Sequence, residues 1–119
     1  VKLWEAASTA AKFVGVALRE VKSATDYMNQ NEGGYHKNEA VPVMKRGCVN
    51  VICQNGTPAP GGKVYIRTVE NESYPKAVIG GFEAAADTGK NVELTNAQWK
   101  GSADANGVAE MRILTILNA

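Results

Sequence analysis

The stretch WKGSADANGVAEMRI, residues 99–113, contains a turn that leads into an alternating strand. Asn106-Gly107 is a strong hairpin signal because both residues tolerate positive φ, and we expect a two-residue turn there that matches the twist of the flanking strands. The residues after it alternate, with Ala109, Met111 and Ile113 on one face and Glu110 and Arg112 on the other. The pattern predicts a half-buried strand of a structural β-protein and holds no catalytic constellation.

Three further segments have the patterning of strands. Residues 11–18 (AKFVGVAL) form a short apolar run with β-branched residues, which predicts a buried strand. Residues 40–53 alternate and predict the strongest strand of the chain. Because proline cannot donate a ladder hydrogen bond, Pro42 should lie at a sheet edge or at the beginning of that strand. Residues 63–69 (KVYIRTV) predict another strand, with Val64 and Ile66 inward.

Weaker strand signals lie between residues 71 and 99. Residues 74–79 predict a short strand interrupted by Pro75, residues 91–94 predict another, and Thr95-Asn96 predicts a turn. The total of about seven or eight short strands, with turns every 8 to 12 residues or so, is typical of a β-sandwich or barrel. We therefore expect an all-β fold with long loops: a single-domain antiparallel β-sandwich or small barrel, with a jelly roll among the topologies considered.

Length and composition are those of one soluble globular domain. The chain has 119 residues, of which 45% are hydrophobic and 21% charged, so one core should suffice. We predict residues 1–119 to be a single β domain in which residues 1–10 form a lead-in segment. Residues 23–38 (SATDYMNQNEGGYHKN) are polar and lack a period of 2 or 3.6. They predict a long loop, and long loops inside compact domains are usually functional or disordered.

The charge balance argues against nucleic acid as a partner. Thirteen basic residues stand against 12 acidic ones, and the longest basic cluster is Lys45-Arg46, so there is no electrostatic footprint for DNA or an anionic membrane. No run of 18 apolar residues and no secretory signal are present. We expect a protein made in the cytosol, without a membrane partner.

The residues able to carry chemistry do not form a recognisable site. The single histidine, His36, lies in the polar loop, where nothing would fix its tautomer for nucleophilic catalysis. Cys48 and Cys53 are five residues apart, so they should lie on opposite strand faces, remain unpaired and serve as buried structural thiols. The acidic residues are interpreted as solvated charges, and Asp104 as part of a turn and not of a calcium loop. We expect no catalytic residues, no metal and no cofactor.

The aromatic residues divide into two groups. Phe13 and Trp99 lie in apolar or alternating segments and are expected in the core. Trp4, Tyr27 and Tyr35 stand in segments that look too polar to bury them within the domain. These three residues, together with Met28, are the candidate anchors of a partner interface.

Three segments carry a family resemblance: AKFVGVALRE at residues 11–20, GGKVYIRTV at 61–69 and WKGSADANGVAEMRI at 99–113. In this order they resemble the structural cement proteins of tailed bacteriophages, in which a FxGVAxR strand precedes a GxxVYVR-like strand and a final SADAxGxAxxR hairpin. The most specific match is SADANGVA at residues 102–109 with Arg112. The match covers about the last 110 residues, so the chain resembles the C-terminal body of such a protein.

The resemblance implies an all-β decoration protein without a cofactor. Such a protein would lie on the outer surface of the virion capsid, after assembly in the host cytoplasm, and tie neighbouring major capsid subunits together. A homo-oligomer, dimer or trimer, would suit a protein that decorates symmetry axes. Residues 1–8 and 23–38 are the segments that we expect to carry these contacts.

Two other function classes remain open at this point. A non-catalytic β-sandwich that binds carbohydrate or protein would place exposed, coplanar Trp and Tyr side chains on one sheet. A small hydrolase would need Glu70 or Glu93 to approach a second acid in a pocket, because glycoside hydrolysis uses paired carboxyl groups.

Overall fold

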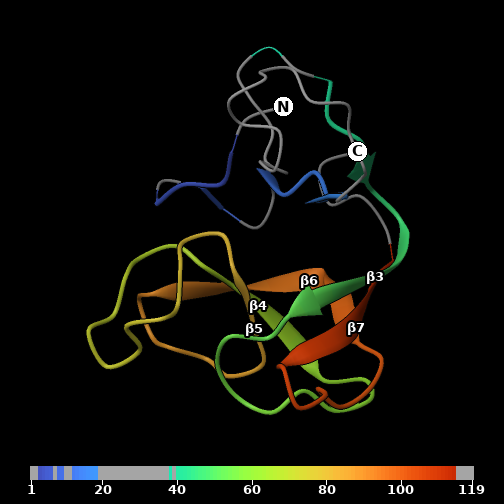
Figure 1. The fold of residues 1–119 in the computed structure, drawn as a ribbon. Helices are drawn as coiled ribbons and strands as arrows, with labels where there is room; N and C mark the ends of the chain where they lie inside the picture. Colours follow the sequence, from blue (N-terminus) through green and yellow to red (C-terminus); the bar gives the residue numbers. More distant parts are fainter. Residues whose placement is uncertain (1–2, 7, 10–11, 19–37, 39, 115–119) are drawn as a thin grey trace, which may run out of the picture.

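The computed structural model describes residues 3–6, 8–9, 12–18, 38 and 40–114, and within them the fold is all-β. No α-helix occurs in this part of the chain. The seven strands are β1 (Val16–Ala17), β2 (Val43–Met44), β3 (Gly47–Ile52), β4 (Lys63–Arg67), β5 (Phe82–Glu83), β6 (Asn91–Trp99) and β7 (Val108–Ile113). Strands β1 and β2 form a small sheet beside the five-stranded sheet of β3 to β7 (Figure 1).

The five-stranded sheet curls until its two edges meet at one end. Its order is β3-β7-β6-β4-β5, and all neighbouring strands are antiparallel. Just beyond β3, the backbone N–H of Gln54 donates to the Phe82 carbonyl of β5 at 3.0 Å, and Ala84 N–H donates to the Asn55 carbonyl at 2.8 Å. The sheet is therefore a small barrel closed only at this end, so the prediction of an all-β sandwich or small barrel is confirmed.

The core lies on the inner face of this sheet. Trp99, Met111 and Val64 are fully buried there, and burial of one large apolar side chain stabilises a fold by roughly 1.5–3 kcal/mol. Strand β7 follows the predicted alternation, since its apolar side chains are buried and its charged ones exposed. The complete buried cluster is Phe13, Val64, Ile66, Leu94, Ala97, Trp99, Ala109, Met111 and Ile113.

The predicted strand over residues 40–53 is in fact two strands in different sheets. Strand β2 pairs with β1, and Pro42 precedes it, with its carbonyl accepting the N–H of Leu18 at 2.9 Å. Strand β3 pairs with β7. The chain changes direction at Gly47, whose φ of 119° suits glycine. An alternating pattern continues through such a bend, because periodicity does not record the backbone angle at one residue.

Two other local predictions are wrong. Residues 95–96 form no turn, because β6 runs without a break from Asn91 to Trp99. Its pairing with β4 shifts between Val64↔Leu94 and Lys63↔Gln98, so the intervening residues are absorbed in a bulge. Residues 74–79 form turns and no strand, with the N–H of Ala77 donating to the carbonyl of Tyr74 at 3.0 Å.

The connection between β6 and β7 forms the predicted hairpin with a longer turn. Strand β6 ends at Trp99 and β7 begins at Val108, so the connection spans residues 100–107 and not two residues. The Asp104 carboxylate accepts the N–H groups of Asn106 at 2.8 Å and Val108 at 3.0 Å. Gly107 alone in this turn has a positive φ, 78°. Turn chemistry accounts for Asp104, as the sequence predicts.

Candidate interaction surface

The N-terminal segment is anchored on the barrel by aromatic rings. Phe13 is buried and meets Trp4 and Phe82 edge to face, with ring centroids 6.4 and 6.3 Å apart. The Trp4 indole N–H also donates to the Arg67 carbonyl at 3.1 Å. The expectation that Trp4 stands in a segment too polar to bury it is therefore wrong, because its ring packs against the core. Its role in a partner interface stays a prediction.

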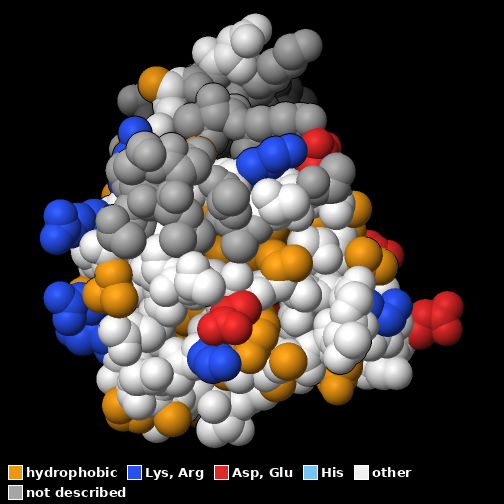
Figure 2. All heavy atoms as spheres, turned by 180° about the vertical axis from the view of Figure 1, so that it is seen from behind, with side chains coloured by type: hydrophobic (Ala, Val, Ile, Leu, Met, Phe, Trp, Pro, Cys, Tyr) orange, Lys and Arg blue, Asp and Glu red, His pale blue; other side chains and the backbone are white. Residues whose placement is uncertain are grey.

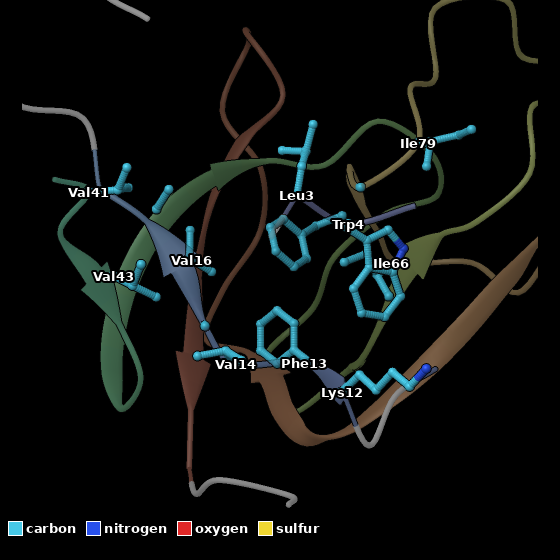
Figure 3. Close-up of a pocket in the computed structure, with 14 residues that line it drawn as sticks. Leu3, Trp4, Lys12, Phe13, Val14, Val16, Val41, Val43, Ile66 and Ile79 are labelled. Carbon is cyan, nitrogen blue, oxygen red and sulfur yellow. The ribbon is translucent and has the colours of Figure 1, made fainter. Parts of the chain in front are cut away.

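An apolar groove lies between the two sheets. It has a volume of about 460 Å³, and Figure 3 shows Trp4 and Phe13 lining it together with Val43 of the small sheet and Ile66 of β4. Leu3 also lines the groove and is 89% exposed, so its side chain adds to the apolar surface there. The groove and Leu3 place apolar surface next to one of the two segments predicted to carry contacts.

Three of the candidate anchors lie outside the described residues. These are Tyr27, Met28 and Tyr35, and the histidine His36 lies there too. Of the predicted loop over residues 23–38, the structure describes only Asn38, which is exposed and has a φ of 68°.

Arg67 and Glu83 form a fully buried ion pair that the sequence did not reveal. Both side chains are 0% exposed. The guanidinium donates to both carboxylate oxygens of Glu83, with Nε to Oε2 at 2.6 Å and Nη2 to Oε1 at 2.9 Å. Its Nη1 reaches Asp87 at 3.1 Å, and the Tyr74 ring lies 5.8 Å from Cζ. The pair joins β4 to β5 on the sheet face opposite Val64 and Ile66.

Amide side chains extend this cluster to the chain that covers it. Asn91 donates to Glu83 at 2.8 Å, and Asn71 donates to Asp87 at 2.9 Å. Gln54 donates to the Val78 carbonyl at 2.9 Å and accepts the Val78 N–H at 3.1 Å. Residues 68–81 contain no strand and are called the excursion below. Two contacts attach the excursion to the barrel, one from Asn71 to Asp87 and one from Val78 to Gln54.

The contacts within the cluster favour the charged forms of Arg67 and Asp87. Burial alone would lower the pKa of Arg67, but the hydrogen bonds and charges of Glu83 and Asp87 outweigh it, so that pKa is raised. The hydrogen bond from Asn71, aided by Arg67, lowers the pKa of Asp87. Asp87, expected to be solvated, is thus paired and only 16% exposed at its side chain. Glu83 and Asp87 both bind the Arg67 guanidinium, so the cluster ties β4 to β5 and to the chain that follows β5.

The acids named for a hydrolase site behave differently. Glu70 is exposed, and Glu93 pairs with Lys63 at 3.8 Å, a partly exposed contact that contributes little. The two acids that do come together, Glu83 and Asp87, share one guanidinium. In the part of the chain that the structure describes, no cluster of three or more His, Cys, Asp or Glu side chains could hold a metal ion.

One comparison with known proteins decides the family. The model of a family described as "Structural cement protein (E217 gp24/Pam3 gp6)" matches residues 1–114 of the 119. The chain belongs to this family of phage structural cement proteins. No curated protein and no solved structure matches it. Family membership confirms the resemblance drawn from the sequence and makes the chain a phage structural protein.

The three segments on which the family resemblance was based all contribute side chains to the core of this cement protein. Residues 11–20 supply Phe13 and β1, residues 61–69 supply β4 with Arg67, and residues 99–113 supply the end of β6 and all of β7.

Among the described residues, no helix is long and apolar enough to cross a membrane.

The exposed aromatic platform of a carbohydrate-binding module is not found among the described residues of the cement protein. Trp99 is fully buried, Trp4 packs on Phe13, and Tyr74 lies over Arg67. A ligand-binding sheet would instead present such rings together on its outer face.

The two cysteines of the cement protein were predicted in part. Both are free, and they lie on opposite faces of the β3 segment as expected. Burial raises the pKa of Cys53, which is half-buried, and its Sγ contacts the Asn55 carbonyl at 3.3 Å. Cys48 is exposed, so its description as a buried thiol is wrong. Its face of β3 is the outer one, where Asn50 and Ile52 are exposed too.

Proposed function

We propose that this cement protein binds the outer surface of a phage head and holds neighbouring major capsid subunits together. The observation that carries the proposal is the family match over residues 1–114. The protein acts by adhesion, as a homo-oligomer and without cofactor, nucleic acid or membrane as partner. Assembly takes place in the host cytoplasm, and the final location is the capsid surface.

Two features of the structure support adhesion by the N-terminal segment. Trp4 and Phe13 attach this segment to the barrel core, so a contact made by its neighbouring residues would be transmitted to the whole body. Leu3 and the groove of about 460 Å³ beside it offer apolar surface to a partner. A stable contact of standard size buries roughly 1,200–2,000 Å² in total, and shell symmetry repeats it many times.

The contacts are assigned to residues 1–8 and 23–38. Trp4 belongs to the first segment, and Tyr27, Met28 and Tyr35 belong to the second. Aromatic residues and Met are enriched at interface cores, and the aromatic rings bury much area at small entropic cost.

The test is a triple variant, Tyr27→Ala with Met28→Ala and Tyr35→Ala, assayed for co-sedimentation with phage heads that lack the protein. We expect binding weaker by about tenfold or more, since an anchor residue contributes at least 1–2 kcal/mol or so, with an unchanged melting temperature. Val78→Ala is the control, because its side chain is 60% exposed on the excursion. Undiminished binding of the triple variant would refute the assignment, and a wild-type protein that does not sediment with heads would refute the function.

A further inference from the structure

The five-stranded sheet has an open edge at β3. On one side β3 pairs with β7, and the N–H of Cys53 donates to the Gly107 carbonyl at 2.8 Å. In an antiparallel pair, every second residue directs its backbone N–H and C=O groups toward the neighbouring strand. The bond at Cys53 therefore shows which residues of β3 are turned toward β7. The backbone groups of the odd-numbered residues face β7, and those of Cys48, Asn50 and Ile52 face away.

Strand β5 covers only the end of this edge. Gln54 is the next even-numbered residue, and its N–H donates to the Phe82 carbonyl of β5. In the part of the chain that the structure describes, no strand pairs with the outward groups of Cys48, Asn50 and Ile52. Figure 1 shows β3 at the near side of the sheet, with β7 as its strand neighbour.

This edge lacks the usual protection against strand addition. Native edge strands carry charged residues, prolines or bulges that prevent pairing with another chain, and β3 (GCVNVI) has neither a charge nor a proline. Figure 2 shows the molecule from behind, where the apolar side chains of the described residues lie in several patches among other groups. We propose that β3 pairs with β3 of a second copy of the chain, antiparallel and centred on Asn50.

The register follows from the two limits of the open edge. The free outward groups at Cys48, Asn50 and Ile52 are symmetric about Asn50. Beyond Ile52 the edge is taken by β5, and before Cys48 the chain bends away at Gly47, with its φ of 119°. A two-fold axis at Asn50 places the bend of one copy where β5 begins in the other. Each outward residue then exchanges two backbone hydrogen bonds with its opposite.

Side chains agree with this register. Ile52, which is 63% exposed, comes opposite Cys48 of the second copy, and the half-buried Val49 comes opposite Val51. Such cross-strand apolar pairs stabilise a sheet. Antiparallel pairing also keeps the basic Lys45-Arg46 segments at opposite ends, whereas in-register parallel pairing would set like charges beside each other. A second copy of this chain therefore fits the edge, and the result is one continuous sheet across two bodies.

The inference deepens the homo-oligomer of the proposed function, and it is tested on purified protein without capsids. Sedimentation equilibrium of the wild type should show a dimer, twice the chain mass of 12.6 kDa. In Asn50→Pro the outward N–H is removed while the bonds to β7 remain. We expect its dimer dissociation constant to rise roughly tenfold to hundredfold, since each copy loses one bond. Ile52→Lys, which places a charge on the edge, should weaken the dimer similarly.

The matched controls are Asn50→Thr, which keeps the N–H, and Thr57→Lys, which adds a charge at an exposed site away from the edge. Both should stay dimeric. A monomeric wild type would overturn the inference. So would folded Asn50→Pro and Ile52→Lys proteins that dimerise as tightly as their controls. The open edge would then be available to a strand of the capsid protein. A dimer that depends on Asn50 but does not bind heads would leave the inference standing and refute the capsid function.

Discussion

Replacing Arg67 with Met should destabilise the protein far more than any surface charge replacement. The guanidinium is fully buried and makes hydrogen bonds to Glu83, Asp87 and the Val69 carbonyl. Its removal leaves the Glu83 carboxylate 0% exposed, with only Asn91 at 2.8 Å and Gln54 at 3.3 Å as donors.

The magnitude follows from the cost of an unpaired buried charge. Breaking one partner of a buried pair costs about 3–5 kcal/mol, whereas small domains are stable by about 5–15 kcal/mol in total. The surface pair Lys100–Glu110, at 3.5 Å and 45% exposed on both sides, should contribute about 0–1 kcal/mol. Arg67→Met should therefore lower the free energy of unfolding several times more than Lys100→Met.

Urea unfolding, followed by the fluorescence of the buried Trp99, measures both changes. The double variant Arg67→Met with Glu83→Leu separates the causes, because it removes the orphaned carboxylate and should recover part of the stability lost in the single variant. The reasoning is refuted if Arg67→Met and Lys100→Met unfold at the same urea concentration. It is also refuted if the double variant loses the sum of its two single losses.

Two further predictions concern the sheet contact at Gly15 and the acid response of Asp87. A Cβ on Gly15 would clash with the Met44 carbonyl oxygen, so Gly15→Ala should lower the free energy of unfolding in urea by roughly 1–3 kcal/mol. Ala17→Ser, at an exposed position of β1, should change it little. Equal stability of the two variants would contradict the close approach. Because the folded-state pKa of Asp87 lies below its ordinary value of 3.8, its stabilising contribution is complete above that value and is lost as pH falls through the folded pKa. Asp87→Asn should therefore be less stable than the wild type at neutral pH, and its free energy of unfolding should fall less on acidification between about pH 5 and pH 2. If the free energy of unfolding of both proteins fell in parallel, Asp87 would not be the group responsible.

Local alternation predicted the parts of the fold in which burial repeats along the strand. Strands β4 and β7 each carry apolar side chains at every second position, and the structure buries Val64, Ile66 and Met111 as expected. Phe13 and Trp99 were assigned to the core for the same reason, and both are buried. These features depend on neighbouring residues, so sequence patterning contains them.

Arg67 shows why the charged cluster could not be predicted in the same way. In KVYIRTV the arginine falls on the face opposite Ile66, which a period-two pattern assigns to solvent. Its burial depends on residues 68–81 folding back over that face and on Glu83, 16 positions away. The only available signal was an arginine in a strand next to a weakly patterned excursion that ends in Gly80-Gly81.

Among the candidate anchors, Trp4 shows the same limit. Composition near Trp4 is polar, yet the ring packs against Phe13 and bonds to the Arg67 carbonyl. A single aromatic residue can dock on a distant sheet without any periodic signal in its own segment. The bend at Gly47 was missed for a related reason, because the conformation of one residue redirects a strand and leaves its hydrophobic alternation intact.

Arg67 is held from two sides, with its carbonyl bound by Trp4 and its guanidinium by Glu83 and Asp87. Both attachments end on this one residue of β4, so we expect the amide protons of the N-terminal segment and of the excursion to exchange as one cooperative unit. Under the proposed function, tension that a pressurised head applies to the N-terminal segment would reach the barrel at this residue and spread across hydrogen-bonded strands. A mechanically loaded joint would thus coincide with a fully buried charge.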